Sequence, residues 1–308
     1  MLSEKSIELV EYVKRISNEI AELKIRGATK IALTALEVLR KVALEAPLDE
    51  LDNVFNKAIE LLINSRPTEP AMQNGMRYVL YNYERALSEK GKSESIREVI
   101  KQATENFRRK MKEAVDRIIE IGWRRVPDNG VVMTHCHSST VVRILSKAKD
   151  EGKKFVVITS ETRPLFQGRK TAKELAENGV RVYHIVDSAM RWAARKFKPD
   201  LAIIGADAIG SNGVAINKIG SKLLALVARE FDFPLYVATT LLKLDIRTVV
   251  GEYTSIELRD PKEIWPDAPS GIEILNPAFE TIGPDYIDAM ITEAGVIAPS
   301  DVLRAFKE

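Results

Sequence analysis

The feature that most constrains the fold is a change in the spacing of apolar residues near residue 122. Before it, apolar side chains recur every three or four residues, the spacing of one buried helix face. The first such series is Ile7, Val10, Val13, Ile16, Ile20 and Leu23. Glycine is scarce in this half, so little interrupts the helices. The sequence therefore predicts an N-terminal all-helical domain, residues 1–122, of about five amphipathic helices.

After Gly122–Gly130, short apolar runs alternate with stretches long enough for a helix. Each run is rich in β-branched residues, a texture typical of buried parallel strands joined by crossover helices. We expect residues 123–308 to form a Rossmann-like, doubly wound parallel sheet domain of the α/β class, with ligands at the carboxyl ends of its strands. The expected strands are 131–134, 155–158, 182–186, 201–204 and 235–238.

Composition excludes several classes of protein. The 46 Lys and Arg residues nearly balance 44 Asp and Glu, which argues against a dedicated nucleic-acid surface. No window approaches the ~18 apolar residues of a membrane span, and the charged start lacks a secretory signal pattern. A single cysteine excludes an internal disulfide framework and a cysteine-built zinc site. We expect a cytoplasmic protein with no metal and no cofactor.

Polar residues follow the first expected strand. Ser138, Ser139 and Thr140 fall at a helix start, where hydroxyl and backbone N–H groups bind phosphate or simply cap the helix. Cys136 precedes the same helix, a position that lowers the pKa of a thiol and favours a reactive thiolate. The alternative is a small buried core residue.

The histidines do not predict a metal site. If the strand continues, His135 and His137 share one face and Cys136 lies on the other, so the three cannot converge on one ion. His184 falls inside an expected strand and is interpreted as a core residue.

Asp207 follows the fourth expected strand among glycines, where a carboxyl in a partly dry pocket can transfer a proton. An Asx turn or a helix cap is the alternative. The segment lacks the glycine spacing of a dinucleotide fingerprint, and the chain has no phosphate-binding GxxxxGK[ST] loop. Asn217 and Lys218 are expected to open the next helix, and Lys243 is expected to follow the fifth strand. Both lysines would then lie at the edge of the sheet that binds the ligand. The alternative is that each is a solvated surface residue.

Two loops of the helical half carry an arginine: Arg26-Gly27-Ala28-Thr29 and Ser65-Arg66-Pro67-Thr68. A guanidinium in such a loop can bind a phosphate. A surface turn explains either loop as readily.

Several motifs together resemble one superfamily. They are Glu161-Thr162-Arg163-Pro164 with Gln167-Gly168, Gly205-Ala206-Asp207 with Asn212-Gly213, and Asn217-Lys218-Ile219-Gly220. The superfamily contains methylthioribose-1-phosphate isomerases, ribose 1,5-bisphosphate isomerases and regulatory subunits of the translation-initiation guanine nucleotide exchange factor. The resemblance covers nearly the whole chain, because members have a helical domain before a Rossmann-like one. Arg26-Gly27-Ala28 is similar to the N-terminal substrate loop of the family.

The resemblance implies an enzyme. Isomerases of the superfamily keep a cysteine after the first strand and an aspartate in the Gly-Ala-Asp segment, which Cys136 and Asp207 match. The methylthioribose enzymes usually carry Cys-Asn-Thr-Gly, whereas this chain reads Cys136-His137-Ser138-Ser139. That run is similar to the ribose 1,5-bisphosphate isomerases of archaeal AMP salvage, which feed a carboxylase of the RuBisCO type.

By the same resemblance, Cys136 is the base and Asp207 the acid that convert ribose 1,5-bisphosphate to ribulose 1,5-bisphosphate. The residues expected to bind the substrate are Arg26, Gly27, Ala28, Thr29, Arg66, Ser138, Ser139, Thr140, Asn217, Lys218 and Lys243. Glu161, Arg163 and Gln167 recur in non-catalytic relatives and are interpreted as structural or interface residues.

Two alternatives stay open: a methylthioribose-1-phosphate isomerase and a non-catalytic regulatory subunit similar to those of the exchange factor. The resemblance also implies a homo-oligomer, dimeric through the α/β domain and hexameric as a trimer of dimers among the bisphosphate isomerases. Its partner is a small sugar bisphosphate, with no nucleic acid and no membrane.

Overall fold

The computed structural model describes residues 2–25, 27–91, 93–252 and 256–307. Contacts divide the chain into two compact units, Met1–Lys112 and Glu113–Glu308. The division falls within helix α5 (Ser95–Gly122), ten residues before the boundary predicted at residue 122. None of the helices in the described ranges is both long and apolar enough to cross a membrane.

The first unit is helical, as predicted. Each helix buries an apolar face; in α1 this face includes Leu9, Val13, Ile16 and Ile20. At the start of α1 the prediction is wrong, because Ile7 is exposed and Val10 is only half-buried. Helix α1 packs on α3, and α2 packs on α3 and α4. Ser3 caps α1 by accepting a hydrogen bond from the Ser6 N–H at 3.3 Å. The helices are α1 (Glu4–Ala21), α2 (Ala28–Glu45), α3 (Leu51–Ser65), α4 (Pro70–Lys90) and the first part of α5.

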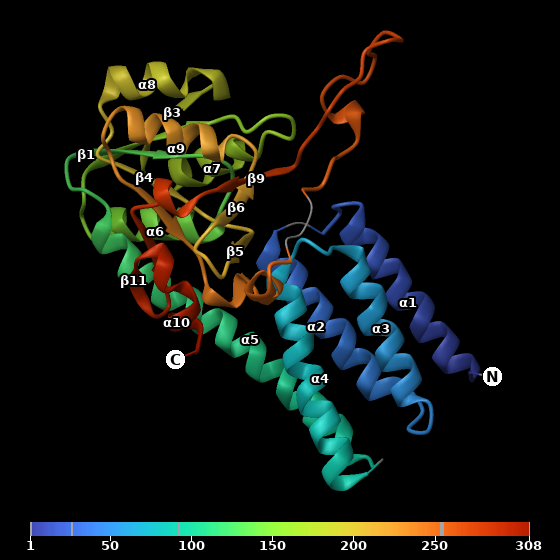
Figure 1. Ribbon diagram of the computed structural model, residues 1–308. Coiled ribbons are helices and arrows are strands. Elements are labelled where there is room, and N and C mark those ends of the chain that lie inside the picture. The colour runs from blue at the N-terminus through green and yellow to red at the C-terminus, as the bar shows by residue number, and fades with distance from the viewer. Residues whose placement is uncertain (1, 26, 92, 253–255, 308) are drawn as a thin grey trace. The chain divides into compact units, whose positions relative to one another are not determined.

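The second unit contains the predicted doubly wound sheet (Figure 1). Among its described residues, seven strands lie in the order β11-β10-β7-β4-β1-β2-β3. Strand β11 is antiparallel to β10, and the other neighbours pair in parallel. The five predicted strands are confirmed. The strands are β1 (Gly130–Thr134), β2 (Phe155–Ser160), β3 (Arg181–Ile185), β4 (Leu201–Ile204), β7 (Leu235–Ala238), β10 (Ala289–Thr292) and β11 (Gly295–Ile297).

Helices cover both faces of this sheet, because successive strand residues point to opposite sides. In β1, Val132 packs in a cluster with α6 (Ser139–Asp150), α7 (Gln167–Glu177) and the end of α5. Its neighbour Met133 packs in a second cluster with α8 (Met190–Phe197) and α9 (Ser221–Glu230). Figure 1 shows α8 and α9 on one side of the strands and α6 on the other. The chain ends in α10 (Val302–Lys307).

A smaller sheet follows β4 and was not predicted. In the described part of the chain its order is β8-β5-β6-β9. The prediction that Asn217 and Lys218 open a helix is wrong: they end β6, which pairs in antiparallel fashion with both β5 and β9. Helix α9 begins only at Ser221, after Gly220 with φ 101°. The strands are β5 (Ala208–Gly210), β6 (Ala215–Lys218), β8 (Leu244–Asp245) and β9 (Phe279–Ile282).

The prediction that His184 is a core residue is also wrong. Strand β3 lies at the edge of the large sheet, and His184 is exposed on it. Its Nδ1 forms a hydrogen bond of 2.7 Å with Thr159 Oγ1 on β2.

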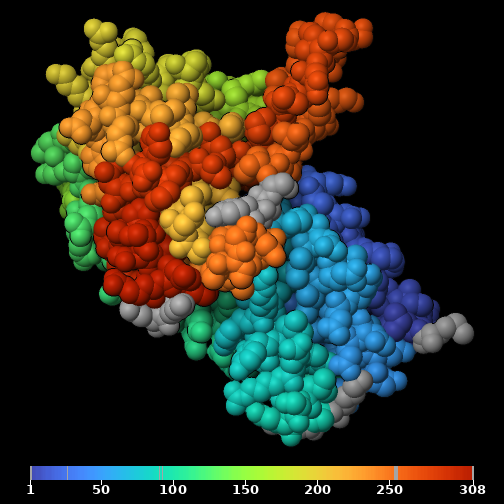
Figure 2. Space-filling view, viewed as in Figure 1, coloured from blue at the N-terminus to red at the C-terminus, as the bar shows by residue number. Residues whose placement is uncertain are grey.

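An arm over residues 256–277 stands out from the second unit (Figure 2). Its base is closed by hydrogen bonds from Arg259 N to the Asn276 carbonyl and from Ala278 N to the Glu257 carbonyl. Leu258, Trp265 and Leu275 are exposed on it.

The close approach of α7 to β2 requires glycine at position 168. A Cβ atom there would lie 1.6 Å from the Ser160 carbonyl oxygen, a backbone atom that cannot move independently. We expect Gly168→Ala to lower the free energy of unfolding of the second unit by about 3 kcal/mol. All three tryptophans (Trp123, Trp192, Trp265) lie in this unit, so urea unfolding followed by tryptophan fluorescence measures it.

The matched control is Gly283→Ala, since its Cβ atom would meet nothing closer than 3.9 Å. That change is expected to stay within about 0.5 kcal/mol of the wild type. Equal stability of the two variants would contradict the packing argument.

Candidate active site

The site lies where β1 and β4 end side by side. These strands are parallel neighbours, yet the chain passes through β2 and β3 between them, so the strand order reverses here. Ligands of doubly wound sheets bind at this switch point, beyond the carboxyl ends of the strands. Cys136 follows the end of β1 at Thr134, and Asp207 follows the end of β4 at Ile204. Both side chains are half-buried.

The backbone of Cys136 is held from both sides in a left-handed conformation with φ 65°. Its N–H donates to Thr162 Oγ1 at 2.9 Å, and its carbonyl accepts from Thr171 Oγ1 at 2.8 Å. The strand therefore does not continue through these residues, and the predicted arrangement of the histidines on one strand face is wrong. His135 is buried, whereas half-buried His137 forms a 3.1 Å hydrogen bond with Thr171 Oγ1.

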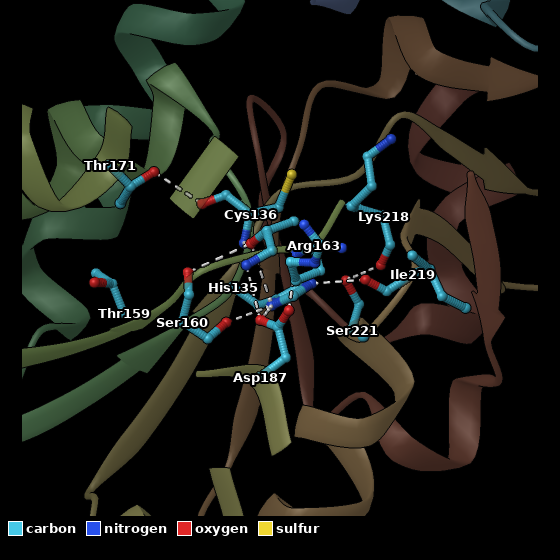
Figure 3. Close-up of polar contacts among 12 residues, drawn as sticks. His135, Cys136, Thr159, Ser160, Arg163, Thr171, Asp187, Lys218, Ile219 and Ser221 are labelled. Carbon is cyan, nitrogen blue, oxygen red and sulfur yellow. Dashed lines mark hydrogen bonds and ion pairs between the residues drawn. The ribbon is translucent and has the colours of Figure 1, made fainter. Parts of the chain in front are cut away.

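Asp187, just after β3, fixes the loop that supports Cys136. Its Oδ1 accepts from Thr162 N at 2.8 Å, and its Oδ2 accepts from Arg163 N at 2.7 Å. Thr162 itself has φ 61°, so the carboxylate stabilises a strained turn. Figure 3 shows Asp187 beneath this cluster, on the side away from the Cys136 sulfur.

The buried His135 ring has a partner at each nitrogen. Its Nε2 lies 2.8 Å from the Ile219 carbonyl oxygen, which can only accept, so Nε2 carries the proton. Its Nδ1 then accepts from Ser160 Oγ at 2.6 Å. Burial lowers the pKa of His135, despite the opposite effect of Asp187 and in line with that of Lys218. The ring is therefore neutral near pH 7.

Burial raises the pKa of the Cys136 thiol to about 12. The Lys218 ammonium lowers this pKa, and the Asp207 and Asp187 carboxylates raise it. The predicted lowering by the helix start is wrong, because desolvation of the thiolate outweighs it. The resting residue is a thiol.

Two lysines lie at this edge of the structure. Lys243 Nζ donates to the Ala206 carbonyl at 2.5 Å, one residue before Asp207. Lys218 ends β6, and its ammonium lies 4.3 Å from the centre of the Phe279 ring. Asp207 N donates to the Ile216 carbonyl at 2.8 Å, which ties the aspartate to β6 as well.

Two of the other predicted ligands of the second unit, Ser138 and Asn217, have structural partners. Ser138 caps α6 through a 3.4 Å hydrogen bond from Val141 N, while Ser139 is exposed and Thr140 half-buried. Asn217 is buried and donates to Ser221 Oγ at 2.8 Å.

The start of α9 already has an anion. Glu280 Oε1 accepts from Gly220 N at 2.5 Å and from Lys222 N at 2.8 Å. A substrate phosphate would therefore have to compete with this carboxylate at α9.

The described predicted ligands of the helical unit lie at the start of α2 and directly after the end of α3. Arg26 lies outside the described residues. Gly27 is exposed, Ala28 buried and Thr29 half-buried at the start of α2. Arg66 is buried, with its Nε 3.3 Å from Glu69 Oε1.

Four residues of this cluster were not predicted from the sequence as site residues: His135, Thr162, Thr171 and Asp187. Three of them follow the ends of β1, β2 and β3, and that position is the signal that could have found them. Within the described residues, His, Cys, Asp and Glu side chains form no group of three or more that could hold a metal ion.

Comparison with known proteins places the chain in one family over nearly its whole length. The Initiation factor 2 subunit family matches residues 24–299. A ribose 1,5-bisphosphate isomerase of Pyrococcus furiosus is 39% identical over 97% of this chain and 94% of its own length. A methylthioribose-1-phosphate isomerase of Thermosipho africanus is 31% identical over 97% and 92%. The crystal structure of translation initiation factor eIF-2B of Pyrococcus horikoshii OT3 superposes with a TM-score of 0.79 at 28% identity, covering 97% of this chain and 98% of that one.

A thiol with a pKa of about 12 has a distinct alkylation profile. The rate constant for iodoacetamide should rise about tenfold per pH unit from pH 7 to 10, because the thiolate fraction keeps rising. An ordinary thiol levels off near pH 9. Cys136 is the only cysteine, so mass spectrometry of the intact protein measures this site alone. A plateau below pH 9.5 would contradict the raised pKa.

Buried histidines also predict how stability depends on pH. Burial lowers the pKa of both His135 and His137 below the unfolded value near 6.5. The contribution of the two neutral rings to the free energy of unfolding is therefore fully present above pH 6.5. It is lost as the pH falls, by up to about 1.4 kcal/mol per pH unit for each histidine. In urea unfolding between pH 6.5 and 5, we expect His135→Gln to reduce this slope by up to that amount. An unchanged slope would mean that His135 is not buried as a neutral ring.

Proposed function

The chain belongs to the Initiation factor 2 subunit family and is an isomerase of that family, and we propose that it converts ribose 1,5-bisphosphate to ribulose 1,5-bisphosphate. The observation that carries the proposal is the position of Cys136 and Asp207 after the two strands that flank the switch point. The 39% identity to a ribose 1,5-bisphosphate isomerase over nearly the full chain supports the choice of substrate.

The chemistry follows from the phosphate on C1. It blocks spontaneous opening of the ring, so a free aldehyde is not available. Asp207 gives a proton to the ring oxygen as the C1–O bond breaks, and the Cys136 thiolate takes the proton from C2. The electron pair of the C2–H bond forms a C1=C2 enol. Protonation at C1 and loss of the 2-hydroxyl proton then give the ketone. An acid and a base suffice for these steps.

The two roles support each other electrostatically. With a pKa of about 12, about one thiol in 10⁵ is ionised at pH 7. The Asp207 carboxylate is one cause of that high pKa. Once Asp207 is protonated, as an acid must be, its charge no longer opposes the thiolate, while the Lys218 ammonium still favours it. The reactive form is therefore the pair of a carboxylic acid and a thiolate.

Two phosphates need two cationic regions. We assign Lys218 and Lys243, with Ser138, Ser139, Thr140 and Asn217, to substrate binding in the second unit. Gly27, Ala28, Thr29 and Arg66, together with Arg26, stay predicted ligands from the helical unit.

The product bisphosphate fits AMP salvage that feeds a carboxylase of the RuBisCO type, and we propose this place for the enzyme. We also propose a homo-oligomer, a dimer or a hexamer built as a trimer of dimers. The described helices contain no membrane span, and we propose a cytoplasmic location.

A methylthioribose-1-phosphate isomerase is the second candidate, since one such enzyme is 31% identical. Its substrate needs one phosphate site and an apolar pocket for the thioether. Ser138 and Ser139 after Cys136 favour the bisphosphate instead.

Proton NMR of ribose 1,5-bisphosphate with the enzyme in D₂O tests the reaction. We expect ribulose 1,5-bisphosphate with deuterium at C1, because a proton held by the Cys136 thiol exchanges with solvent. Cys136→Ser and Asp207→Asn should each lower kcat at least about 100-fold, the scale of general acid–base catalysis. Lys173→Met, a change of an exposed side chain of α7, is the matched control and should keep wild-type kcat.

Turnover of methylthioribose 1-phosphate alone would select the second candidate. No turnover of either sugar phosphate would support a regulatory protein of translation initiation. Product without deuterium would point to hydride transfer or a shielded proton.

A further inference from the structure

His135 connects three segments that are far apart in the sequence. It follows β1, accepts from Ser160 at the end of β2, and donates to the Ile219 carbonyl in the turn between β6 and α9. The second bond spans 84 positions of the chain. A neutral ring with one fixed tautomer thus joins the loop of Cys136 to the turn after Lys218.

Gly220 shows how closely this turn approaches the ring. A Cβ atom at position 220 would lie 2.6 Å from His135 Nε2, and the residue has φ 101°, which side chains disfavour. The peptide of Ile219 and Gly220 therefore lies directly against the imidazole. The N–H groups of this turn are held separately, by the Ala278 carbonyl and Glu280 Oε1, so loss of the ring would release the Ile219 carbonyl alone.

Lys218 is adjacent to this turn. Its carbonyl accepts from Ser221 Oγ at 2.7 Å, and its aliphatic chain carries the ammonium over Phe279. Figure 3 shows the Lys218 nitrogen and the Cys136 sulfur extending to the same, upper side of the cluster, with the His135 ring below them in this view.

We propose that His135 is a positioning residue: by holding the Ile219 carbonyl, it keeps the Lys218 ammonium close to the Cys136 thiol. This inference rests on the proposed function for its catalytic meaning, since a held ammonium stabilises the thiolate base. The charged groups that act on the thiol are Lys218, Asp207 and Asp187. Of these three groups, Lys218 alone stabilises the thiolate. The position of Lys218 therefore determines how much the thiolate is stabilised.

A double-mutant cycle tests the proposal on the free enzyme, with alkylation of Cys136 by iodoacetamide at pH 8 as the readout. Lys218→Met should slow alkylation about threefold, because loss of the ammonium raises the pKa of the thiol and lowers its thiolate fraction, which the greater nucleophilicity of a more basic thiolate offsets only in part. His135→Asn cannot reach Ile219 and should slow alkylation by a similar factor. In the double variant, His135→Asn should add nothing to Lys218→Met.

His135→Gln is the matched control, because its amide can still donate to the Ile219 carbonyl; it should alkylate at the wild-type rate. Ser160→Ala removes the donor that fixes the tautomer and gives a second route if His135→Asn does not fold. It should slow alkylation only when Lys218 is present. Near-ultraviolet circular dichroism checks the fold of each variant.

An equal effect of His135→Asn in the presence and absence of Lys218 would overturn the proposal, since His135 would then act on the loop of Cys136 alone. A wild-type rate for His135→Asn would overturn it as well. Alkylation does not depend on turnover, so these outcomes are separate from failure of the isomerase assay. If the enzyme turns over, His135→Asn should lower kcat and shift its pH profile upward, with recovery in His135→Gln.

Discussion

The parallel pairing of β1 with β4 is the constraint on which the site depends. Val132 pairs with Leu201 and Met133 with Ala202, so both strands end at the same edge. Cys136 and Asp207, 71 positions apart in the sequence, are brought to that edge by this register. The small sheet then extends from β4, and its β6 returns Lys218 to the same region. A shift in the pairing of β1 and β4 would separate the thiol from all of these groups at once.

Burial at this edge has two opposing effects on the Cys136 thiolate. It raises the pKa of the thiol to about 12, so the resting residue is a thiol. A partly dry site also strengthens charge interactions, so the attraction between the Lys218 ammonium and a thiolate is larger there than in water. In the mechanism proposed above, this attraction stabilises the thiolate that takes the proton from C2.

The sequence predicted the large sheet because its strands are continuous apolar runs, such as 155–158 and 201–204. It missed the small sheet, whose strands have two to four residues and whose β5 and β8 pair across 35 positions. His184 was predicted to be a core residue because the order of the strands, which places β3 at the edge of the sheet, cannot be read from the strand pattern alone. His135 was not assigned to the site, because one partner of that ring is a backbone carbonyl 84 positions away and only the place of His135 after the first expected strand pointed to the site.

The motif Asn217-Lys218-Ile219-Gly220 illustrates why shared motifs and shared chemistry differ. Asn217 binds Ser221, and Gly220 leaves room for the His135 ring, so two of its four residues have packing reasons that any member of the fold could keep. A relative named as a translation initiation factor superposes on this chain along nearly its whole length. Structural similarity of this kind therefore identifies the fold of the chain and not its reaction. The proposed chemistry depends instead on Cys136 and Asp207, which follow the ends of β1 and β4.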